Sequence, residues 1–319
     1  MTKWSITAGI WAGIWLSAGS MANAQGVWTK LTPLPARTEG LGIGKVGNRI
    51  VVAYGHSPST GGDNTIARLY DINTDTWTLA APAPGPRRSE IAYGDPSHGG
   101  FIYVAGGRSG PVLKDLDRYD PASNTWTVLT PMPTARAAAG ITSVANALYV
   151  IGGRTTGGGP CSGGALKTVE RYDIDTDTWS AVASLPLAAS DLGVVSHGGK
   201  IYAFGGCTIG GSSATKKVFV YNPVTDTWAM GADMPTQRAS VVAASVGNRI
   251  YVIGGFNGGP PLATNEVYNV VKDTWATDTP IIVGRGESNS VSHGGRIYVV
   301  GGSLPGFGAS TDDVEVFKP

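Results

Sequence analysis

Charged side chains are scarce in this chain. Asp, Glu, Lys and Arg together make up 15% of the 319 residues, the formal net charge is +1, and no run of Lys or Arg is longer than two. A protein that binds along a nucleic-acid backbone needs a clustered basic surface. The composition therefore argues against a nucleic-acid partner.

Long apolar runs are missing except near the N-terminus. There, Lys3 precedes the apolar run 6–16, and Ala22-Asn23-Ala24 forms a small-residue cleavage pattern. This arrangement is typical of a secretory signal peptide, and the run is too short to span a membrane comfortably. We expect cleavage after Ala24 and a mature chain that is secreted or periplasmic, with no membrane span. An uncleaved anchor is the alternative.

Cysteine is nearly absent as well. The only two, Cys161 and Cys207, have no nearby His and so make an incomplete ligand set for zinc. We therefore predict no metal site and no cofactor. In an exported protein, two cysteines favour a single disulfide, and a free pair is the alternative.

Glycine, by contrast, is abundant, with 47 residues, and it accompanies a repeat. A Tyr stands seven residues before a Trp in five similar stretches, of which YDIDTDTWSAVASLP, residues 172–186, is one copy. The stretches begin at Tyr70, Tyr119, Tyr172, Tyr221 and Tyr268. Such repetition indicates that one supersecondary unit is used several times.

In units two to six, an apolar run also ends at a Gly pair, whereas the first unit has Tyr54-Gly55 in that place. The run at 249–253, before Gly254-Gly255, is typical of a strand followed by a turn that needs a positive φ. The equivalent runs are predicted second strands, at 101–105, 147–151, 200–204, 249–253 and 296–300. The repeated Trp residues, at positions 28, 77, 126, 179, 228 and 275, are 47 to 53 residues apart.

A period near 50, four predicted strands per unit and a Gly pair after the second strand resemble the kelch repeat, a β-propeller blade. The resemblance covers nearly all of residues 27–319. It implies an all-β propeller with four antiparallel strands per blade. In such a fold, the Tyr of the third strand and the Trp of the fourth are expected to fill the space between neighbouring sheets.

The two ends of the chain predict the number of blades. The last unit has a Gly pair at Gly301-Gly302 and a third strand at 314–317, but the chain stops before the Trp of that unit is due. The segment 27–31, which carries the first repeated Trp, is a fourth strand without the beginning of its unit. We therefore predict one domain, residues 25–319, with six blades. The N-terminal strand joins the last blade and closes the ring, which removes the exposed sheet edge.

The four His residues do not suggest a metal site. Three of them, His98, His197 and His293, belong to Ser-His-Gly-Gly sequences at the turn between first and second strands, and equivalent turns of a ring lie far apart. His56 is alone in a loop. The chain also lacks Gly-x-Ser-x-Gly, so the nucleophile elbow of a hydrolase is not indicated.

One set of residues remains as a candidate binding site. The loop between each fourth strand and the next first strand carries an arginine in five units, whereas the fourth unit has Ala189. Further arginines follow the Gly pair in units two and three. The candidates are Arg37, Arg88 (or its neighbour Arg87), Arg136, Arg238 and Arg285 in the first set, and Arg108 and Arg154 in the second.

In kelch propellers these two sets of loops surround the mouth of the central channel, and family arginines there often bind acidic motifs. The resemblance therefore implies an anionic protein or glycan ligand, since a guanidinium group binds a carboxylate with two parallel hydrogen bonds. A structural role is the alternative. Acidic residues near these arginines could neutralise them: Glu39, Glu90, Glu287 and Asp191.

The preferred hypothesis is recognition: an exported, monomeric kelch propeller that binds a protein segment or a glycan through its loop-bearing face. The second is enzymatic, because exported bacterial kelch propellers include sialic-acid mutarotases, which use arginine and carboxylate groups at the mouth. The acid–base candidates are then the Arg-x-Glu sequences that end at Glu39, Glu90 and Glu287. The regularity of the repeats argues against a dedicated active site, and a structural envelope component is the third hypothesis.

Overall fold

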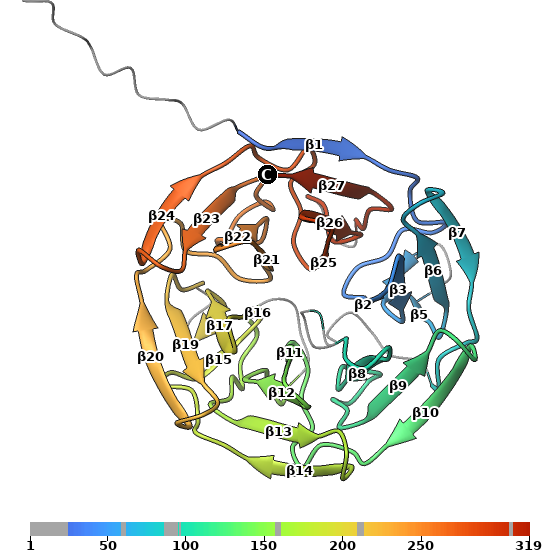
Figure 1. The fold of residues 1–319 in the computed structure, drawn as a ribbon, viewed down its shortest axis with the longest axis horizontal. Helices are drawn as coiled ribbons and strands as arrows, with labels where there is room; N and C mark the ends of the chain where they lie inside the picture. Colours follow the sequence, from blue (N-terminus) through green and yellow to red (C-terminus); the bar gives the residue numbers. More distant parts are fainter. Residues whose placement is uncertain are drawn as a thin grey trace, which may run out of the picture.

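The computed structural model describes residues 25–58, 62–85, 95, 97–156, 161–208, 214–305 and 309–319. The predicted signal peptide, residues 1–24, lies outside these ranges. Within them the chain forms β-strands and no α-helix, and accordingly no helix there could cross a membrane. Figure 1 shows the sheets arranged around a central axis, which confirms the predicted all-β propeller.

Each blade runs outward from the central channel as antiparallel strands in chain order. The strands of blade one are β2 (Gly42–Val46), β3 (Arg49–Ala53), β6 (Ala67–Asp71) and β7 (Thr76–Leu79). A short hairpin, β4 (His56–Ser57) and β5 (Gly62–Asp63), lies between β3 and β6. The second strand is buried after its first residue, since it has a neighbour on both edges and a blade on both faces.

Blades two to six repeat this order. Blade two comprises β8 (Ile102–Ala105), β9 (Leu116–Asp120) and β10 (Thr125–Leu129), and most of its innermost segment lies outside the described residues. Blade three comprises β11 (Gly140–Val144), β12 (Ala147–Ile151), β13 (Val169–Asp173) and β14 (Thr178–Ala181). Blade four comprises β16 (Gly193–His197), β17 (Lys200–Phe204), β19 (Val218–Asn222) and β20 (Thr227–Gly231), with an extra pair, β15 (Ala189–Ser190) and β18 (Cys207–Thr208). Blade five comprises β21 (Val242–Val246), β22 (Arg249–Ile253), β23 (Asn265–Asn269) and β24 (Thr274–Thr277), and blade six comprises β25 (Asn289–His293), β26 (Arg296–Val300), β27 (Val314–Lys318) and β1 (Val27–Lys30).

The Gly pair after the second strand of blades two to six lets the chain turn in a crowded place, where blade one has Tyr54-Gly55. In blade five, Gly254 and Gly255 have φ angles of 67° and 90°, in the left-handed region that favours glycine. A Cβ atom on Gly254 would lie 2.3 Å from the carbonyl oxygen of Arg285. The missing side chain therefore allows the loop that leads into blade six to pack directly on the end of β22.

The N-terminal strand closes the ring, as predicted. Strand β1 pairs antiparallel with β27 and places Trp28 opposite Phe317, with ring centroids 4.8 Å apart. The indole nitrogen of Trp28 also donates a hydrogen bond of 2.9 Å to the carbonyl oxygen of Thr279, which follows the fourth strand of blade five. The two ends of the chain thus complete blade six and attach it to its neighbour (Figure 1).

The repeated Tyr, Asp and Trp residues join neighbouring blades. The Tyr268 hydroxyl of blade five donates a 2.6 Å hydrogen bond to Asp273, and the same carboxylate oxygen accepts the N–H of Ala232, next to blade four, at 2.7 Å. The Trp275 indole nitrogen donates to the carbonyl oxygen of Ala232 at 2.8 Å. Burial and the bond to Asp273 raise the pKa of Tyr268. The residue before each Thr-Trp pair is therefore an inter-blade contact as well as a turn residue, and it is Asp75, Asn124, Asp177, Asp226 or Asp273 in blades one to five.

Candidate functional site

Two sets of loops surround one end of the central channel. Because first and second strands are antiparallel, Val242 begins β21 opposite Ile253, the last residue of β22. The loops that precede first strands and the loops that follow the Gly pairs therefore lie at the same end. We call this end the linker mouth. It comprises the described linker residues 36–41, 136–139, 188–192, 238–241 and 285–288 and the loops that follow the glycines after the second strands.

Arg238 shows where the arginines of these loops go. Its guanidinium group is fully buried inside blade five, 2.6 Å from the carboxylate of Glu266 on β23. It also donates to the carbonyl oxygens of Val252, at 3.2 Å, and Gly254, at 2.7 Å. Burial lowers the pKa of the Arg238 guanidinium, and the attraction of Glu266 opposes this shift. One side chain thus holds the loop, the end of the second strand and the third strand together.

Two more arginines repeat this geometry. Arg136 lies 2.6 Å from Glu170 on β13, Arg285 forms an ion pair with Glu315 on β27, and both also donate to main-chain carbonyl oxygens. Burial raises the pKa of the Glu315 carboxyl, while the charge of Arg285 opposes the rise. The predicted ring of arginines at the channel mouth is thereby corrected for Arg136, Arg238 and Arg285. Each points into its own blade, where a buried carboxylate neutralises it.

Blades one and four lack both members of this ion pair. The arginine position is occupied by Thr38 and Ala189, whose carbonyl oxygens accept the N–H of the second glycine of a Gly pair, as that of Arg285 does. The glutamate position on the third strand is occupied by Arg68 in blade one and Phe219 in blade four. A buried charge without its partner is costly, which explains why the two positions change together.

The remaining predicted arginines have different surroundings. Arg37 stands one residue before the position of the paired arginines, and its side chain is exposed. Arg108 is half-buried and donates a 3.2 Å hydrogen bond to a carbonyl oxygen of its own loop. Arg88, its neighbour Arg87 and Glu90 lie outside the described residues. Arg37 and Arg108 are therefore the described candidates that keep surface toward the solvent.

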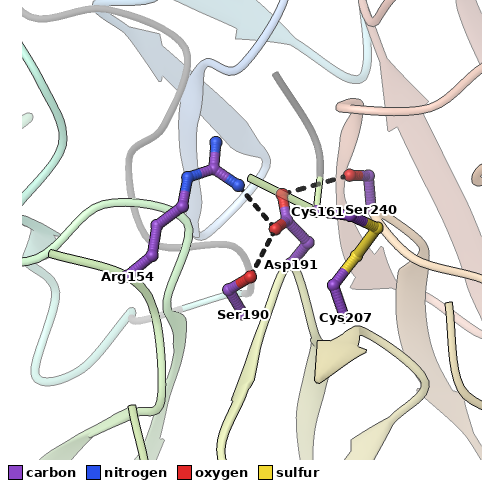
Figure 2. Close-up of a disulfide and its surroundings, with 6 residues drawn as sticks. All are labelled: Arg154, Cys161, Ser190, Asp191, Cys207 and Ser240. Carbon is purple, nitrogen blue, oxygen red and sulfur yellow. Dashed lines mark hydrogen bonds and ion pairs between the residues drawn. A yellow bond between two sulfur atoms is a disulfide. The ribbon is translucent and has the colours of Figure 1, made fainter. Parts of the chain in front are cut away.

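Arg154 forms a different buried ion pair at the linker mouth. Figure 2 shows its guanidinium group beside the carboxylate of Asp191, with a nitrogen–oxygen distance of 2.6 Å and both side chains fully buried. The carboxylate also accepts hydrogen bonds from the hydroxyl groups of Ser190, at 2.7 Å, and Ser240, at 3.4 Å. Residues from three consecutive blades thus meet at one carboxylate, which neutralises Arg154.

The predicted disulfide between Cys161 and Cys207 is present, with Cα atoms 5.0 Å apart (Figure 2). It joins the loops that follow the Gly pairs of blades three and four. The pairing of β15 with β18 places Cys207 opposite Ser190, next to the buried ion pair. Around the sulfur atoms the apolar cluster is small and includes Ala214 and Ala239. A covalent bond, rather than a large core, fixes these two loops to each other.

Glu39 and Glu287 come together where blades six and one meet, at Ser303. The Ser303 hydroxyl oxygen lies 2.6 Å from a carboxylate oxygen of each glutamate. Both glutamates are nearly buried, with 7% and 8% of their surface exposed. From the Arg-x-Glu spacing we expect each glutamate to lie beside its own arginine. In the structure, closure of the ring instead brings both glutamates to the hydroxyl group of Ser303.

A belt of main-chain hydrogen bonds supports the linker mouth. Successive N–H to carbonyl bonds, 2.8 to 3.3 Å long, run from blade to blade through Ala138, Asp191, Ser240, Glu287 and Gly40. All five residues have φ between 49° and 58°, and four of them are not glycine. Such a backbone persists where the surrounding structure enforces it. The side chains of Asp191, Ser240 and Glu287 therefore stand on a rigid base.

The turn histidines lie at the other end of the channel, where first strands meet second strands. His197 and His293 are the last residues of β16 and β25, and His98 bridges to Phe101 in blade two. Burial and the positive charge of Lys45 lower the pKa of His293. Across the described ranges, no group of three or more His, Cys, Asp or Glu residues is placed to hold a metal ion.

Two family models match this chain. The KLHDC2/KLHL20/DRC7 Kelch-repeats domain matches residues 129–302, and the Kelch motif matches residues 93–133. Because the first match covers more than half of the 319 residues, the chain belongs to the kelch-repeat family, which confirms the resemblance of its repeats.

Curated relatives and a solved structure agree with this assignment. Kelch-like protein 25 of Xenopus tropicalis is 36% identical over 149 residues, which is 44% of this chain and 25% of the relative. Kelch-like protein 36 of Bos taurus is 30% identical over 204 residues, which is 60% of this chain and 31% of the relative. The chain therefore spans a quarter to a third of the length of these relatives. The solved structure of YjhT matches 89% of this chain and 95% of its own, with a TM-score of 0.77 and 18% identity, and so shares the fold.

Proposed function

We propose that this kelch propeller is an exported, monomeric binding protein that recognises a protein segment or a glycan through the loops around the linker mouth. The disulfide between Cys161 and Cys207 carries the proposal. The ring is already closed by β1 and β27, so the fold does not need a covalent bond at this face. Recognition loops, however, bind more tightly when they are ordered in advance, because less conformational entropy is lost on binding.

Export is supported by two independent features of the chain. Residues 1–24 have the charged start, apolar run and small-residue end of a signal peptide. The disulfide points the same way, since disulfides form and persist in oxidising compartments outside the cytosol.

The charged side chains that are still accessible at the linker mouth indicate how much charge the ligand carries. Arg37 is exposed and Arg108 is half-buried, whereas Glu39 and Glu287 are nearly buried and lie at the Ser303 hydroxyl. Four predicted arginines are neutralised by buried acids: Arg136, Arg154, Arg238 and Arg285. A rim with few accessible charges suits a polar peptide or a glycan with few charges better than a polyanion.

A binding screen tests this proposal. The mature chain, residues 25–319, is applied to a peptide array with neutral, mixed-charge and acidic sequences and to a glycan array, and the strongest ligand is then titrated by calorimetry. We expect Arg37→Ala, Arg108→Ala and a Cys161→Ser/Cys207→Ser double variant each to weaken binding by about tenfold, the loss of one charge-assisted contact or of loop order. Val224→Ser is the matched control. This exposed residue lies in the turn between β19 and β20, at the other end of the blades, and should bind like the parent. The absence of any ligand on both arrays, or equal affinity in all variants, would argue against the proposal and leave the structural envelope role.

The contact of Glu39 and Glu287 with Ser303 supports a second candidate, a sugar mutarotase that resembles the sialic-acid mutarotases. When either carboxyl group carries a proton, the Ser303 hydroxyl can accept a hydrogen bond from it and donate one to the other, so the three groups form a proton relay. Exposed Arg37 would then hold the carboxylate of the sugar.

Anomer exchange measured by NMR with N-acetylneuraminate tests this candidate. A mutarotase should accelerate exchange over buffer, and Glu39→Gln or Glu287→Gln should reduce the acceleration by about a hundredfold, the usual contribution of a positioned acid or base. Exchange at the buffer rate with the parent protein would exclude this activity and leave the binding proposal untouched.

A further inference from the structure

The central channel contains a cavity at the end opposite the linker mouth. Its volume is about 300 Å³. It is lined by the later residues of the innermost strands, next to the turns that lead to the second strands. Ligand sites in proteins typically have volumes of about 300–1,000 Å³, so this cavity has the size of a site for a small molecule.

Hydroxyl groups dominate the wall because of one repeated position. The fourth residue of each described first strand is serine in blades three to six, and Ser97 takes the corresponding place in blade two. The serines are Ser97, Ser143, Ser196, Ser245 and Ser292, and all five line the cavity. Lys45 holds the position in blade one. A small polar side chain at this place keeps the channel open, whereas the neighbouring second strands are apolar and packed.

Some of these hydroxyl groups are already used. Ser97 accepts the N–H of Lys45 at 2.6 Å and donates to Asp95 at 2.5 Å, and Ser143 donates to the carbonyl oxygen of Ser97 at 2.9 Å. Ser245 shares a 2.8 Å hydrogen bond with Nδ1 of His197. These contacts fix the wall at blades two to five and leave other hydroxyl groups for a molecule in the cavity.

Thr142 and Ser290 are the informative members of the wall. They are only 2% and 4% exposed, both line the cavity, and neither hydroxyl group has a hydrogen-bond partner among the described residues. The small surface that each side chain keeps faces the cavity, so its hydroxyl group is placed to pair with a molecule there. Two such groups in one polar cavity, on strands of different blades, offer a polar molecule in the channel two hydrogen bonds.

The charges at the cavity favour an uncharged occupant. Asp95 is the carboxylate of the described wall. Burial raises the pKa of the Asp95 carboxyl, while its hydrogen bonds with Ser97 and the charge of Lys45 oppose the rise. The opposite charges of Asp95 and Lys45 offset each other. The described lining residues include no aromatic ring, so binding would rest on hydrogen bonds rather than stacking.

We propose that the cavity binds one small, uncharged polyhydroxy molecule, of the monosaccharide or cyclic-polyol class. Its hydroxyl groups pair with those of Thr142, Ser196, Ser290 and Ser292, and the Asp95 carboxylate accepts from vicinal hydroxyl groups. The site lies at the other end of the channel from the recognition loops and does not depend on their function.

Calorimetric titration of the mature chain with D-glucose, D-galactose and myo-inositol, one at a time, tests the proposal. At least one probe should bind at millimolar concentrations. Thr142→Val keeps the shape of the side chain and removes the hydroxyl group, and Ser290→Ala removes the other buried hydroxyl group. Each variant should weaken binding about fivefold, the effect of one hydrogen bond. Ser196→Ala, at a half-buried serine of the same wall, provides the same affinity measurement if Thr142→Val or Ser290→Ala does not fold.

Ser180→Ala is the matched control, because Ser180 is exposed on the outermost strand β14 and should leave affinity unchanged. The proposal is overturned by any of three results: no probe binds, all wall variants bind like the parent, or D-glucuronate binds whereas the uncharged probes do not. Failure of the peptide and glycan arrays would not affect this outcome, since those ligands are tested at the linker mouth by different variants.

Discussion

Replacing Arg238 with alanine is expected to lower the free energy of unfolding by about 3–5 kcal/mol, the usual cost of removing one partner of a buried ion pair. The change leaves the Glu266 carboxylate buried without a counter-charge, and the carbonyl oxygens of Val252 and Gly254 lose a donor. Urea denaturation of the mature chain, followed by tryptophan fluorescence, measures the loss. Arg37→Ala is the matched control, because this exposed side chain should change stability by less than about 0.5 kcal/mol.

The two residues that blade four carries at these positions suggest a double variant that should restore the lost stability. Ala189 and Phe219 occupy the positions of Arg238 and Glu266 there, so the double variant Arg238→Ala/Glu266→Phe transfers a pair that the same fold already accepts. It should recover more than half of the stability lost in the single variant, because no charge is left buried and the volume is refilled. If Arg238→Ala costs less than about 1 kcal/mol, the value of an ordinary hydrogen bond, the arginine does not hold the blade together.

Deleting residues 25–35 is expected to lower the melting temperature by at least about 10 °C, a larger loss than one core substitution usually causes. The deletion removes β1 from β27, strips the buried Trp28 from Phe317, and takes away Leu34, which is 2% exposed in the core between blades six and one. Calorimetric scans at one heating rate compare the truncated and complete mature chains. A truncated protein that melts with the complete one would rule out this closure.

Two point variants in β1 test how much of this stability comes from the buried Trp28 and how much from the rest of the strand. Trp28→Ala should cost about 3–5 kcal/mol, as large-to-small changes of buried aromatic residues do. Val27→Ala, at a position with 63% of its surface exposed, should have little effect. A synthetic peptide of residues 25–35 should raise the melting temperature of the truncated chain in a concentration-dependent way, because it can add the missing strand to the open edge.

The fold could be predicted because its signals are local and repeated. The run at 249–253 and the pair Gly254-Gly255 specify a strand and a turn wherever they occur, and the structure places β22 at the same residues. The break between Phe317 and Trp28 specified the closure, since only one arrangement completes the last blade. The disulfide was also accessible, because its two cysteines are the only ones and lie in consecutive units.

The candidate site was harder to predict. Arg37 and Arg238 look equivalent in sequence, yet a shift of one residue leaves the first exposed and buries the second. The glutamates that pair with the linker arginines stand on third strands about 30 residues away, so proximity in sequence pointed to the wrong acids. A comparison between units could have found them, because Ala189 and Phe219 replace both members in the same blade.

The sequence by itself determined the kelch propeller, its six blades and its closure. Strand periodicity and Gly pairs act over a few residues, and the spacing of the repeats and the last unit divided between the two chain ends can be read directly along the chain. Only the tertiary structure decided which charges are available. Whether an arginine faces a ligand or a buried carboxylate depends on the register of each linker against the next blade, and the meeting of Glu39 with Glu287 depends on closing the ring. The hydroxyl groups of the channel gather for the same reason: successive blades each contribute one, and the circle brings them together.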